Sequence, residues 1–386
     1  MTFYVLLSTL FFLAALAIIA WLHNQSWLEI QTPHVTPPAS GTLISVIVPA
    51  RNEAKNIRRC VESILAQDYP TFEVFVLDDR STDETPAILA ELSASDSRLV
   101  ILAGGDLPEG WAGKPHALFQ ATAAARGEWL LLLDADTFLH PNALSASLAA
   151  TKKTGADLYT VMTEQILGSF WEKTVMPLVF TALSVGFSPK KVNDPTSRDA
   201  IANGQYIFIR RSVYDAVGGH AAVKNKIVED KALSEKVKWG GYRLIIADGR
   251  GIAQTRMYTD LAAMWEGWTK NIYLGLADTP AMLLLGAFGA FLALMAALFM
   301  PVWPLLGFFW WRNGGGIWAA LVMAQALTVW AALIFVRARV NAEMKISPGY
   351  ALLTPLGAGV FAAMMFTSAW KVLSGQGVTW KGRRYQ

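Results

Sequence analysis

The stretch Leu130–Thr137, Leu-Leu-Leu-Leu-Asp-Ala-Asp-Thr, constrains the fold more than any other part of the chain. An apolar run of this length between polar residues fits a strand that is buried on both faces of a parallel sheet. Asp134 and Asp136 would then follow the strand at the sheet edge where open α/β domains bind ligands. There the two carboxylates can converge on one divalent cation. The alternative is a buried strand followed by a loop in which the aspartates only form a turn.

The same pattern occurs twice earlier in the chain. The β-branched run Leu43–Ala50 precedes Glu53, and the apolar run Phe72–Leu77 precedes Asp78 and Asp79. Apolar residues at helical spacing separate these runs, for example over residues 56–67 and 116–125. This alternation predicts an α/β domain with a doubly wound, mainly parallel sheet. Three acidic strand ends at one edge repel one another unless a cation neutralises them, which favours a cation with a polyphosphate ligand.

The composition predicts a membrane protein with a water-soluble part. Of the 386 residues, 53% are hydrophobic and 16% are charged, whereas soluble domains carry about 25% charged residues. The net charge is only +3, and no basic run with interleaved aromatic residues occurs before the extreme C-terminus, so we expect no nucleic-acid partner. The single cysteine, Cys60, excludes an intrachain disulfide and a cysteine-rich zinc site.

The N-terminal region is organised as an anchor and a linker. Phe3–Leu22 is uncharged and strongly apolar, and its length suffices to cross a hydrocarbon core of roughly 30 Å. We therefore interpret residues 1–25 as a transmembrane anchor, with a cleaved signal peptide as the alternative. Residues 26–42 are a proline-rich linker. The soluble catalytic domain is expected over residues 43–260.

Two apolar segments near the soluble domain also contain charged residues. Leu167–Phe187 is almost continuously apolar but includes Glu172, Lys173 and Pro177. This composition favours a segment lying against a bilayer, with a buried domain helix as the alternative. Residues 261–279 have the pattern of an amphipathic interfacial helix. That helix could instead place its aromatic and basic residues over the active site.

Three hydrophobic segments, Ala281–Val302, Ile317–Val336 and Tyr350–Trp370, are each long enough to span a bilayer. We expect a C-terminal transmembrane region over residues 280–372 and a basic cytoplasmic tail over residues 373–386. Basic residues follow both the second and the third segment: Arg337, Arg339 and Lys345, then Lys371, Lys381, Arg383 and Arg384. The positive-inside rule puts both groups in the cytoplasm, which three simple crossings cannot satisfy. Either residues 288–311 make an additional excursion, or the segment that contains Pro355 is re-entrant.

Five motifs occur in a characteristic order: Val48–Glu53, Leu77–Asp83, Trp111–Lys114, Asp134–Asp136 and Val228–Asp230. Together they resemble the motifs of the inverting GT-A glycosyltransferases of family 2. The resemblance covers about Ile44–Asn271. Nearly the whole chain is similar to the membrane-anchored, hopanoid-associated members and to their carotenoid and ceramide glucosyltransferase relatives. This closer similarity rests on Gly110–Lys114, Lys191–Pro195, the flanking hydrophobic segments and the ending Val378–Tyr385.

The resemblance implies a Rossmann-like GT-A domain that transfers a sugar from a nucleoside-diphosphate sugar, with UDP as the expected nucleotide. The acceptor would be the hydroxyl of a hopanoid, sphingolipid-like or other isoprenoid lipid. Donor-binding roles would fall to Pro49, Glu53, Asp79, Lys114 and Asp134. Asp136, with Asp134, would hold a divalent cation, Mg²⁺ or Mn²⁺. Asp230 would be the general base that takes the proton of the acceptor.

The chain departs from the family pattern in two places. Asp78-Asp79-Arg80-Ser81 replaces the commoner Asp-Asp-Gly-Ser, and the carboxylates are retained. Trp265–Asn271 stands where the family usually has Gln or Arg, two residues, then Arg-Trp; we expect Trp268 and Lys270 to bind the donor there. The expected location is a bacterial inner membrane, crossed several times, with the catalytic domain in the cytoplasm. Two alternatives remain: a polysaccharide synthase of the same family, and a catalytically degenerate GT-A membrane scaffold.

Overall fold

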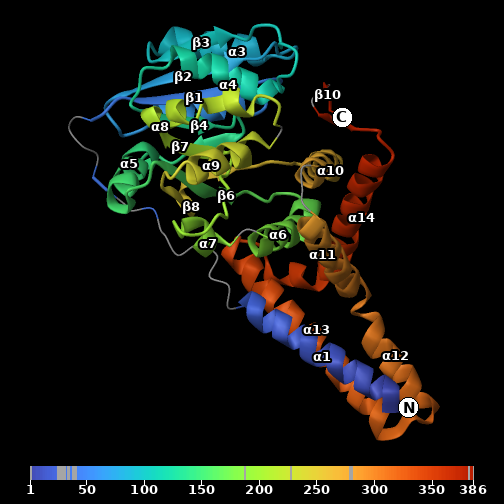
Figure 1. Cartoon of the computed structure of the whole chain (residues 1–386). Coiled ribbons are helices and arrows are strands. Elements are labelled where there is room, and N and C mark those ends of the chain that lie inside the picture. Colours follow the sequence, from blue (N-terminus) through green and yellow to red (C-terminus); the bar gives the residue numbers. More distant parts are fainter. Residues whose placement is uncertain are drawn as a thin grey trace. The chain divides into compact units, whose positions relative to one another are not determined.

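The computed structural model describes residues 2–23, 32, 35–36, 41–186, 188–226, 228–277, 281–380 and 383–385. The chain divides into two compact units. Unit 1 comprises residues 1–26, 167–186 and 258–386, and unit 2 comprises residues 27–166 and 187–257. Figure 1 labels the helices and strands of both units.

Unit 2 is built on an eight-stranded sheet with the strand order β3-β2-β1-β4-β7-β6-β8-β5. The strands are β1 (Ile44–Ala50), β2 (Phe72–Asp78), β3 (Leu99–Ala103), β4 (Trp129–Leu133), β5 (Thr137–Leu139), β6 (Leu158–Gln165), β7 (Tyr206–Arg210) and β8 (Leu244–Thr255). The four strands from β3 to β4 are parallel, as predicted. β7 runs antiparallel to both β4 and β6, and β5 runs antiparallel to β8. β6 runs parallel to β8, so six of the eight strands point the same way. The sheet is therefore mixed but mainly parallel, as predicted; the reversed direction of β7 and β5 was not predicted, because an apolar run has the same pattern in either strand direction.

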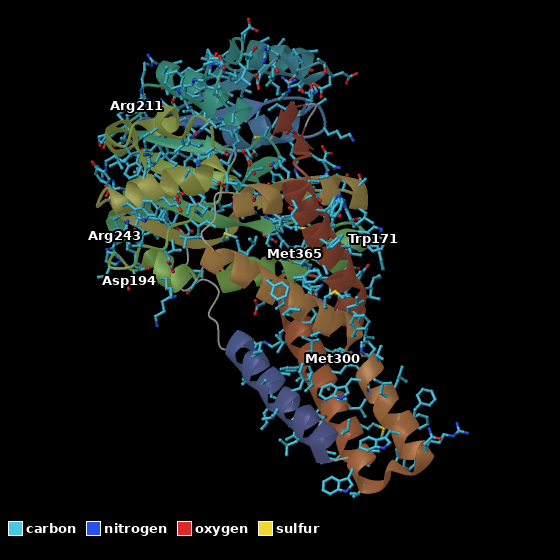
Figure 2. All side chains as sticks on the ribbon, turned by 45° about the vertical axis from the view of Figure 1, so that its right-hand side comes forward. Trp171, Asp194, Arg211, Arg243, Met300 and Met365 are labelled. Atoms are coloured by element: carbon cyan, nitrogen blue, oxygen red, sulfur yellow. The ribbon has the colours of Figure 1, made fainter. Side chains whose placement is uncertain are left out.

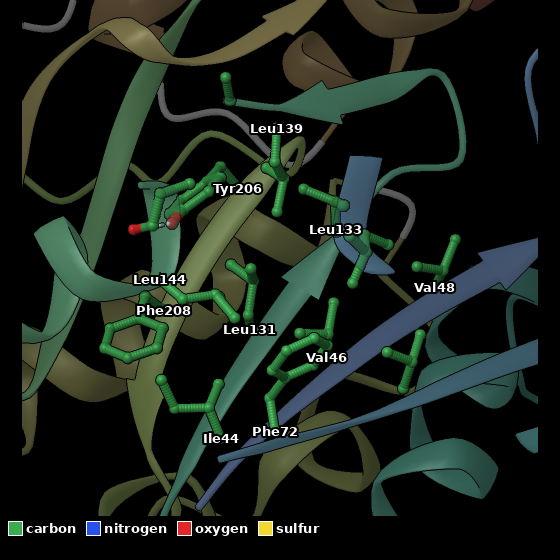
Figure 3. Packing of buried hydrophobic residues seen from close by; sticks show 14 of the residues in the cluster. Ile44, Val46, Val48, Phe72, Leu131, Leu133, Leu139, Leu144, Tyr206 and Phe208 are labelled. Atoms are coloured by element: carbon green, nitrogen blue, oxygen red, sulfur yellow. Dashed lines mark hydrogen bonds between the residues drawn. The ribbon is translucent and has the colours of Figure 1, made fainter. Parts of the chain in front are cut away.

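Helices cover both faces of this sheet. They are α2 (Ile57–Leu65), α3 (Thr85–Ser95), α4 (Gly113–Ala124), α5 (Ala143–Thr154), α7 (Pro189–Asn193), α8 (Arg211–Ala216) and α9 (Glu229–Trp239), with a 3₁₀ turn at Gly219–Val223. Side chains of a strand alternate between the faces, so Val46 and Leu131 join the core under α2 and α5, whereas Ile47 and Leu132 join the core under α4 and α9. Figure 3 shows the first of these cores. Both faces of the sheet are therefore buried, as the continuous apolar runs of the strands predicted.

The long strand β8 was not predicted from the sequence. It contains Gly249 and Gly251, and glycine in a strand normally weakens the pattern. A Cβ atom on Gly249 would lie 2.6 Å from the carbonyl oxygen of Met162 on β6. The glycine is therefore needed where β6 changes register against β8, between Thr163 and Glu164.

Unit 1 consists of helices and one small hairpin. The helices are α1 (Thr2–His23), α6 (Phe170–Gly186), α10 (Leu261–Ala277), α11 (Ala281–Phe299), α12 (Val302–Trp310), α13 (Gly316–Glu343) and α14 (Thr354–Leu373). A π-helical turn at Trp311–Gly315 joins α12 to α13, a 3₁₀ turn at Pro348–Leu353 precedes α14, and β9 (Val378–Trp380) pairs with β10 (Arg383–Tyr385). By length and composition, Val302–Glu343 and Pro348–Lys371 could each cross a membrane; Ser8–Ile18 and Phe288–Phe299 are shorter apolar helices among the described residues.

The two amphipathic segments predicted from the sequence both form helices of unit 1. In α6, Pro177 has no N–H for the carbonyl of Lys173 four residues earlier. Arg337 of α13 donates from Nη2 to that carbonyl at 3.1 Å and to the carbonyl of Thr174 at 3.0 Å. In α10, Trp268 is buried and its Nε1 lies 3.3 Å from the sulfur of Met176. The lipid-facing role of both helices stays a prediction.

Candidate active site

The ends of β1 and β2 bring two predicted site residues together. Pro49 and Ala50 pair in register with Leu77 and Asp78. The backbone N–H of Asp79 then donates to the carbonyl of Ala50 at 2.7 Å, and Asp79 is buried. Pro49 and Asp79 therefore lie on neighbouring strands at the carboxyl edge of the sheet, as the sequence predicted.

The loops after β1 and β2 are tied to each other. Asn52 donates its N–H to Ser81 Oγ at 2.9 Å and accepts from the N–H of Thr82 at 2.8 Å. Asn52 and Arg80 both have positive φ angles, 54° and 57°, which favour small or polar residues in tight loops. Beside them lies an open hollow of about 550 Å³, lined by residues 52–56 and 82–84. Glu53, whose Oε2 accepts from Asn56 Nδ2 at 3.0 Å, is part of this lining.

Two of the predicted carboxylates, Asp134 and Asp136, follow the end of β4. Asp134 follows the strand directly, and its carbonyl accepts from the N–H of Thr137 at 3.0 Å. Burial raises the pKa of the Cys60 thiol well above its usual value, and the negative charges of Asp136, Glu53 and Asp134 raise it further. Sγ of Cys60 lies 3.8 Å from the carbonyl oxygen of Asp134, so this buried thiol packs against the end of β4.

Lys114, at the start of α4, joins the end of β4 to α9. Its Nζ lies 2.7 Å from Asp134 Oδ1 and 2.8 Å from Glu229 Oε1. The Glu229 side chain is only 5% exposed. Burial lowers the pKa of the Lys114 ammonium, but the charges of Asp134, Glu229 and Asp230 outweigh burial and raise that pKa well above its usual value. Lys114 is therefore a firmly charged cation between two carboxylates.

Asp230 is held by backbone N–H groups. Its Oδ2 accepts from Gly204 at 2.9 Å, and its Oδ1 accepts from Lys231 at 2.7 Å. Burial, together with the Glu229 charge, raises the pKa of the Asp230 carboxyl to about 6, although the Lys114 charge opposes both. A Cβ atom on Gly204 would lie 2.7 Å from Asp230 Oδ2. Only glycine at position 204 allows this approach without a shift.

The structure brings four of the predicted residues of unit 2 together: Pro49, Lys114, Asp134 and Asp230. Lys114 contacts Asp134, and Asp230 lies beside Gly204, where an added Cβ would be 3.2 Å from Lys114 Nζ. Pro49 lines the same small cavity as Lys114 and Asp134. Trp268 and Lys270 belong to α10 of unit 1. Their donor-binding role stays a prediction.

Three residues of this site were not chosen from the sequence: Glu229, Gly204 and His220. Glu229 precedes the predicted base directly, and Gly204 stands in Asn203-Gly204-Gln205 before β7, so both lay next to noted motifs. His220 lines the small cavity and its Nδ1 lies 2.8 Å from the hydroxyl of Tyr214. Burial and the nearby Lys114 charge lower the pKa of His220 to about 3, so its ring is neutral. No sequence pattern marked His220.

The donor set of Asp134 and Asp136 fits a hard divalent cation. Within the described ranges, no group of three or more His, Cys, Asp or Glu side chains could hold a metal ion by itself. Mg²⁺ is commonly bound by one or two carboxylates together with substrate phosphates and water. The ammonium of Lys114 on Asp134 shows that positive charge is already favoured there. These residues therefore suit a cation that takes its other ligands from a phosphate-bearing substrate.

Comparisons with known proteins agree with this fold. The family model "Glycosyl transferase family 2" matches residues 45–218. The chain is 27% identical over 347 residues to 4,4'-diaponeurosporenoate glycosyltransferase of Staphylococcus aureus strain MRSA252, covering 89% of this chain and 88% of that protein. It is also similar to the mannosyltransferase PcManGT from Pyrobaculum calidifontis, solved with GDP-Man and Mn²⁺. The TM-score is 0.55 at 18% identity, covering 96% of this chain and 98% of that chain. At that identity the likeness concerns the fold, which is the predicted GT-A fold.

Proposed function

Because this chain is a glycosyltransferase whose residues 45–218 form a family 2 domain, we propose that it transfers a sugar from a UDP-sugar to the hydroxyl of a membrane lipid. The observation that carries the proposal is the cluster of Lys114, Asp134, Glu229 and Asp230 at the carboxyl edge of the sheet. The name of the Staphylococcus aureus relative supports a carotenoid-like acceptor. We extend the acceptor class to hopanoids, sphingolipid-like lipids and other isoprenoid lipids.

Asp230 is the proposed general base. As the acceptor oxygen bonds to the anomeric carbon, the Asp230 carboxylate takes the hydroxyl proton, and the bond from that carbon to the diphosphate breaks. This single displacement inverts the configuration at the anomeric carbon. The N–H groups of Gly204 and Lys231 fix the orientation of the carboxylate before the acceptor arrives. A base held in place loses little entropy on reaching the transition state.

The donor is proposed to lie along the ends of β1, β2 and β4. Pro49, Glu53 and Asp79 would bind the nucleoside, and Asp134 and the Lys114 ammonium would lie against the nucleotide. Asp136, with Asp134, would hold Mg²⁺ or Mn²⁺; when bound, such an ion stabilises the charge on the departing diphosphate. The Mn²⁺ and GDP-Man with which PcManGT was solved support a cation and a nucleotide sugar. Trp268 and Lys270 remain proposed donor contacts from α10.

We further propose that the chain is an inner-membrane protein of bacteria, with residues 1–25 and 280–372 as its membrane regions, 26–42 as linker, 261–279 as interfacial helix and 373–386 as cytoplasmic tail. The catalytic domain, residues 43–260, would face the cytoplasm. The exposed large apolar side chains support this proposal. In unit 2 they are limited, among the described residues, to Val100, Phe119 and Trp239, whereas α1, α11, α12 and α13 carry many. Bare apolar surface of this extent is typical of lipid contact.

The test is a transfer assay with the full chain in lipid vesicles. UDP release is measured with a panel of nucleotide sugars, Mn²⁺ and bacterial lipid extract, and the glycolipid product is identified by mass spectrometry. We expect lipid-dependent transfer that falls by about 10²–10⁴-fold in Asp230→Asn, with UDP binding by calorimetry retained. The matched control is Asp215→Asn, because Asp215 is an exposed aspartate of the same unit.

Four results would contradict parts of this proposal. If Asp230→Asn transfers sugar at an unchanged rate, Asp230 is not the general base. Transfer without any lipid acceptor removes the lipid part, and a polymeric sugar product would favour the polysaccharide synthase. Absence of both UDP binding and transfer would favour a degenerate scaffold.

A further inference from the structure

The arrangement of the helices in unit 1 indicates on which side of the membrane the C-terminus lies. Basic residues follow both α13 and α14, and they can share one side only if α14 does not cross. This inference rests on the membrane part of the proposed function. The contacts that carry it all lie within unit 1, between α14 and its neighbours and within the bundle formed by α1, α12 and α13.

The bundle has the dimensions of one bilayer crossing. Ile317–Val336 of α13 is uncharged, and twenty helical residues rise about 30 Å, close to the thickness of a hydrocarbon core. Gln325 of α13 bonds to Ser8 and Thr9 of α1, and Gly307 of α12 packs against Met323. The uncharged stretch lies between Arg312 in the turn after α12 and Arg337.

α14 begins at the charged end of this bundle. A Cβ atom on Gly357 would lie 2.4 Å from the carbonyl oxygen of Thr174, and Arg337 donates to that same oxygen. Gly357, Thr174 and Arg337 therefore lie at one level. The segment that α14 contacts there is α6, which carries Glu172 and Lys173 in its first turn. Charged side chains mark a membrane boundary rather than its centre.

From this level α14 leaves the bundle. It packs against α6, α10 and α11, whereas α13 packs against α1 and α12. In Figure 1, α14 runs from the end of α13 toward the C-terminus, away from α1 and the turn between α12 and α13. In Figure 2 the reader can find these segments by two labelled residues: Met300 lies at the junction of α11 and α12, and Met365 lies on α14. Of the three partners, α6 and α10 carry charged residues, among them Glu266 and Lys270 of α10, whereas α11 carries none.

The outer face of α14 is apolar. Its exposed large side chains are Leu356, Phe366, Trp370 and Leu373, spaced so that they form one stripe along the helix. Lys371 follows within the last turn. An apolar stripe with a basic end suits the surface of a bilayer that contains anionic lipids, where the lysine meets the headgroups and the stripe meets the acyl chains.

We propose that α14 is an interfacial helix that lies on the lipid surface at the Arg337 side of the membrane. The chain then crosses three times, through α1, through α12 with the end of α11 that precedes it, and through α13. The turn at Trp311–Gly315 lies on the far side together with the N-terminus. Arg339, Lys345, Lys371 and the C-terminal residues all lie on the side of the catalytic domain, which satisfies the positive-inside rule.

Labelling of introduced cysteines tests the topology. Asn313→Cys, Ser347→Cys and Gln376→Cys are made in the full chain, all at exposed positions. The parent is the unlabelled control, because Cys60 is buried and its raised pKa disfavours the reactive thiolate. An impermeant maleimide applied to intact spheroplasts should label position 313 at least tenfold more than positions 347 and 376. In inverted membrane vesicles, the order should reverse.

The outcomes separate this inference from the proposed function. If the cysteine at position 376 is labelled from the side opposite to the cysteine at position 347, α14 crosses the membrane. That result overturns the inference but leaves the proposed membrane bundle unchanged. Labelling of 313 on the same side as 347 overturns both the inference and the proposed membrane bundle. Neither result touches the glycosyl transfer assay, which fails or succeeds independently.

Spin labels test the contact of α14 with lipid. Phe366→Cys and Trp370→Cys carry nitroxides in vesicles of phosphatidylethanolamine and phosphatidylglycerol, with Gln376→Cys as the water-exposed control. We expect relaxation by dissolved oxygen to exceed relaxation by a water-soluble nickel chelate at 366 and 370, and the opposite at 376. Greater relaxation by the chelate at 366 and 370 would place the stripe in water and overturn the proposal.

Discussion

The candidate active site depends on close approaches between single residues. Lys114 reaches two carboxylates from different elements, and Asp230 accepts a backbone N–H from Gly204. Neither arrangement tolerates an extra atom: a Cβ on Gly204 would meet both Asp230 and Lys114. The position of the proposed base is therefore set by a residue that has no side chain.

Replacing Gly204 by alanine should displace the Asp230 carboxylate. Because the added Cβ would lie 2.7 Å from Oδ2 and 3.2 Å from Cγ of Asp230, we expect kcat to fall by about 10- to 100-fold, the scale of a misplaced catalytic group. UDP affinity measured by calorimetry should change little. Gly105→Ala is the matched control, since its Cβ would meet only the side-chain oxygen of Gln120. Equal losses in both variants would argue against a positioning role for Gly204.

The pH profile of kcat/KM should show the ionisation of Asp230. A general base acts only when it is ionised, so activity should fall as the pH drops through the pKa of about 6. The Glu229 charge raises that pKa, so Glu229→Gln should move the acid limb to lower pH. The measurement is initial transfer rate from pH 5 to 8 at constant ionic strength. An acid limb that stays in place or moves upward in Glu229→Gln would contradict the assignment.

At the scale of elements, α6 contains an internal proline, and a neighbouring helix supplies the hydrogen bond that the proline cannot donate. Pro177 cannot donate to the carbonyl of Lys173, and Arg337 of α13 supplies a donor instead. Gly357 of α14 then packs against the neighbouring carbonyl of Thr174. A carbonyl with no donor at a buried or lipid-facing position is costly. Arg337 is therefore a structural link between three helices.

A double-mutant cycle tests this link. Arg337→Met removes the donor to Lys173, and we expect a loss of about 1–3 kcal/mol of stability, the usual cost of leaving a buried acceptor unpaired. In a Pro177→Ala background, the new N–H at position 177 can bond to that carbonyl, so Arg337→Met should cost less. The midpoint of thermal unfolding in detergent, followed by circular dichroism, gives both values.

The control for this cycle is Arg339→Met, because Arg339 is about half exposed and lies 4.0 Å from Glu343. Its effect should be small and the same in both backgrounds. Additive effects of Pro177→Ala and Arg337→Met would show that Arg337 does not replace the missing helical hydrogen bond.

At the scale of the whole molecule, the two units differ in what their sequences specify. In unit 2, apolar strands ending in carboxylates predicted an α/β sheet with its site at the carboxyl edge. The parallel strands from β3 to β4, which bring their carboxyl ends to one edge, are confirmed. The ion pair of Lys114 with Asp134 is a finding of the structure. In unit 1, the sequence located the long apolar and amphipathic helices, while their arrangement about a bilayer stays a proposal.

The sequence alone determined which segments are apolar, where β1, β2 and β4 end and which carboxylates follow them, because these are local patterns of neighbouring residues. Only the tertiary structure decided the antiparallel direction of β7, the pairing of Glu229 with Lys114, the need for glycine at position 204 and the link from Arg337 to Lys173. Each of these joins residues that are far apart in the chain. Such contacts are set by the packing of whole elements against one another, and no periodicity along the sequence records them.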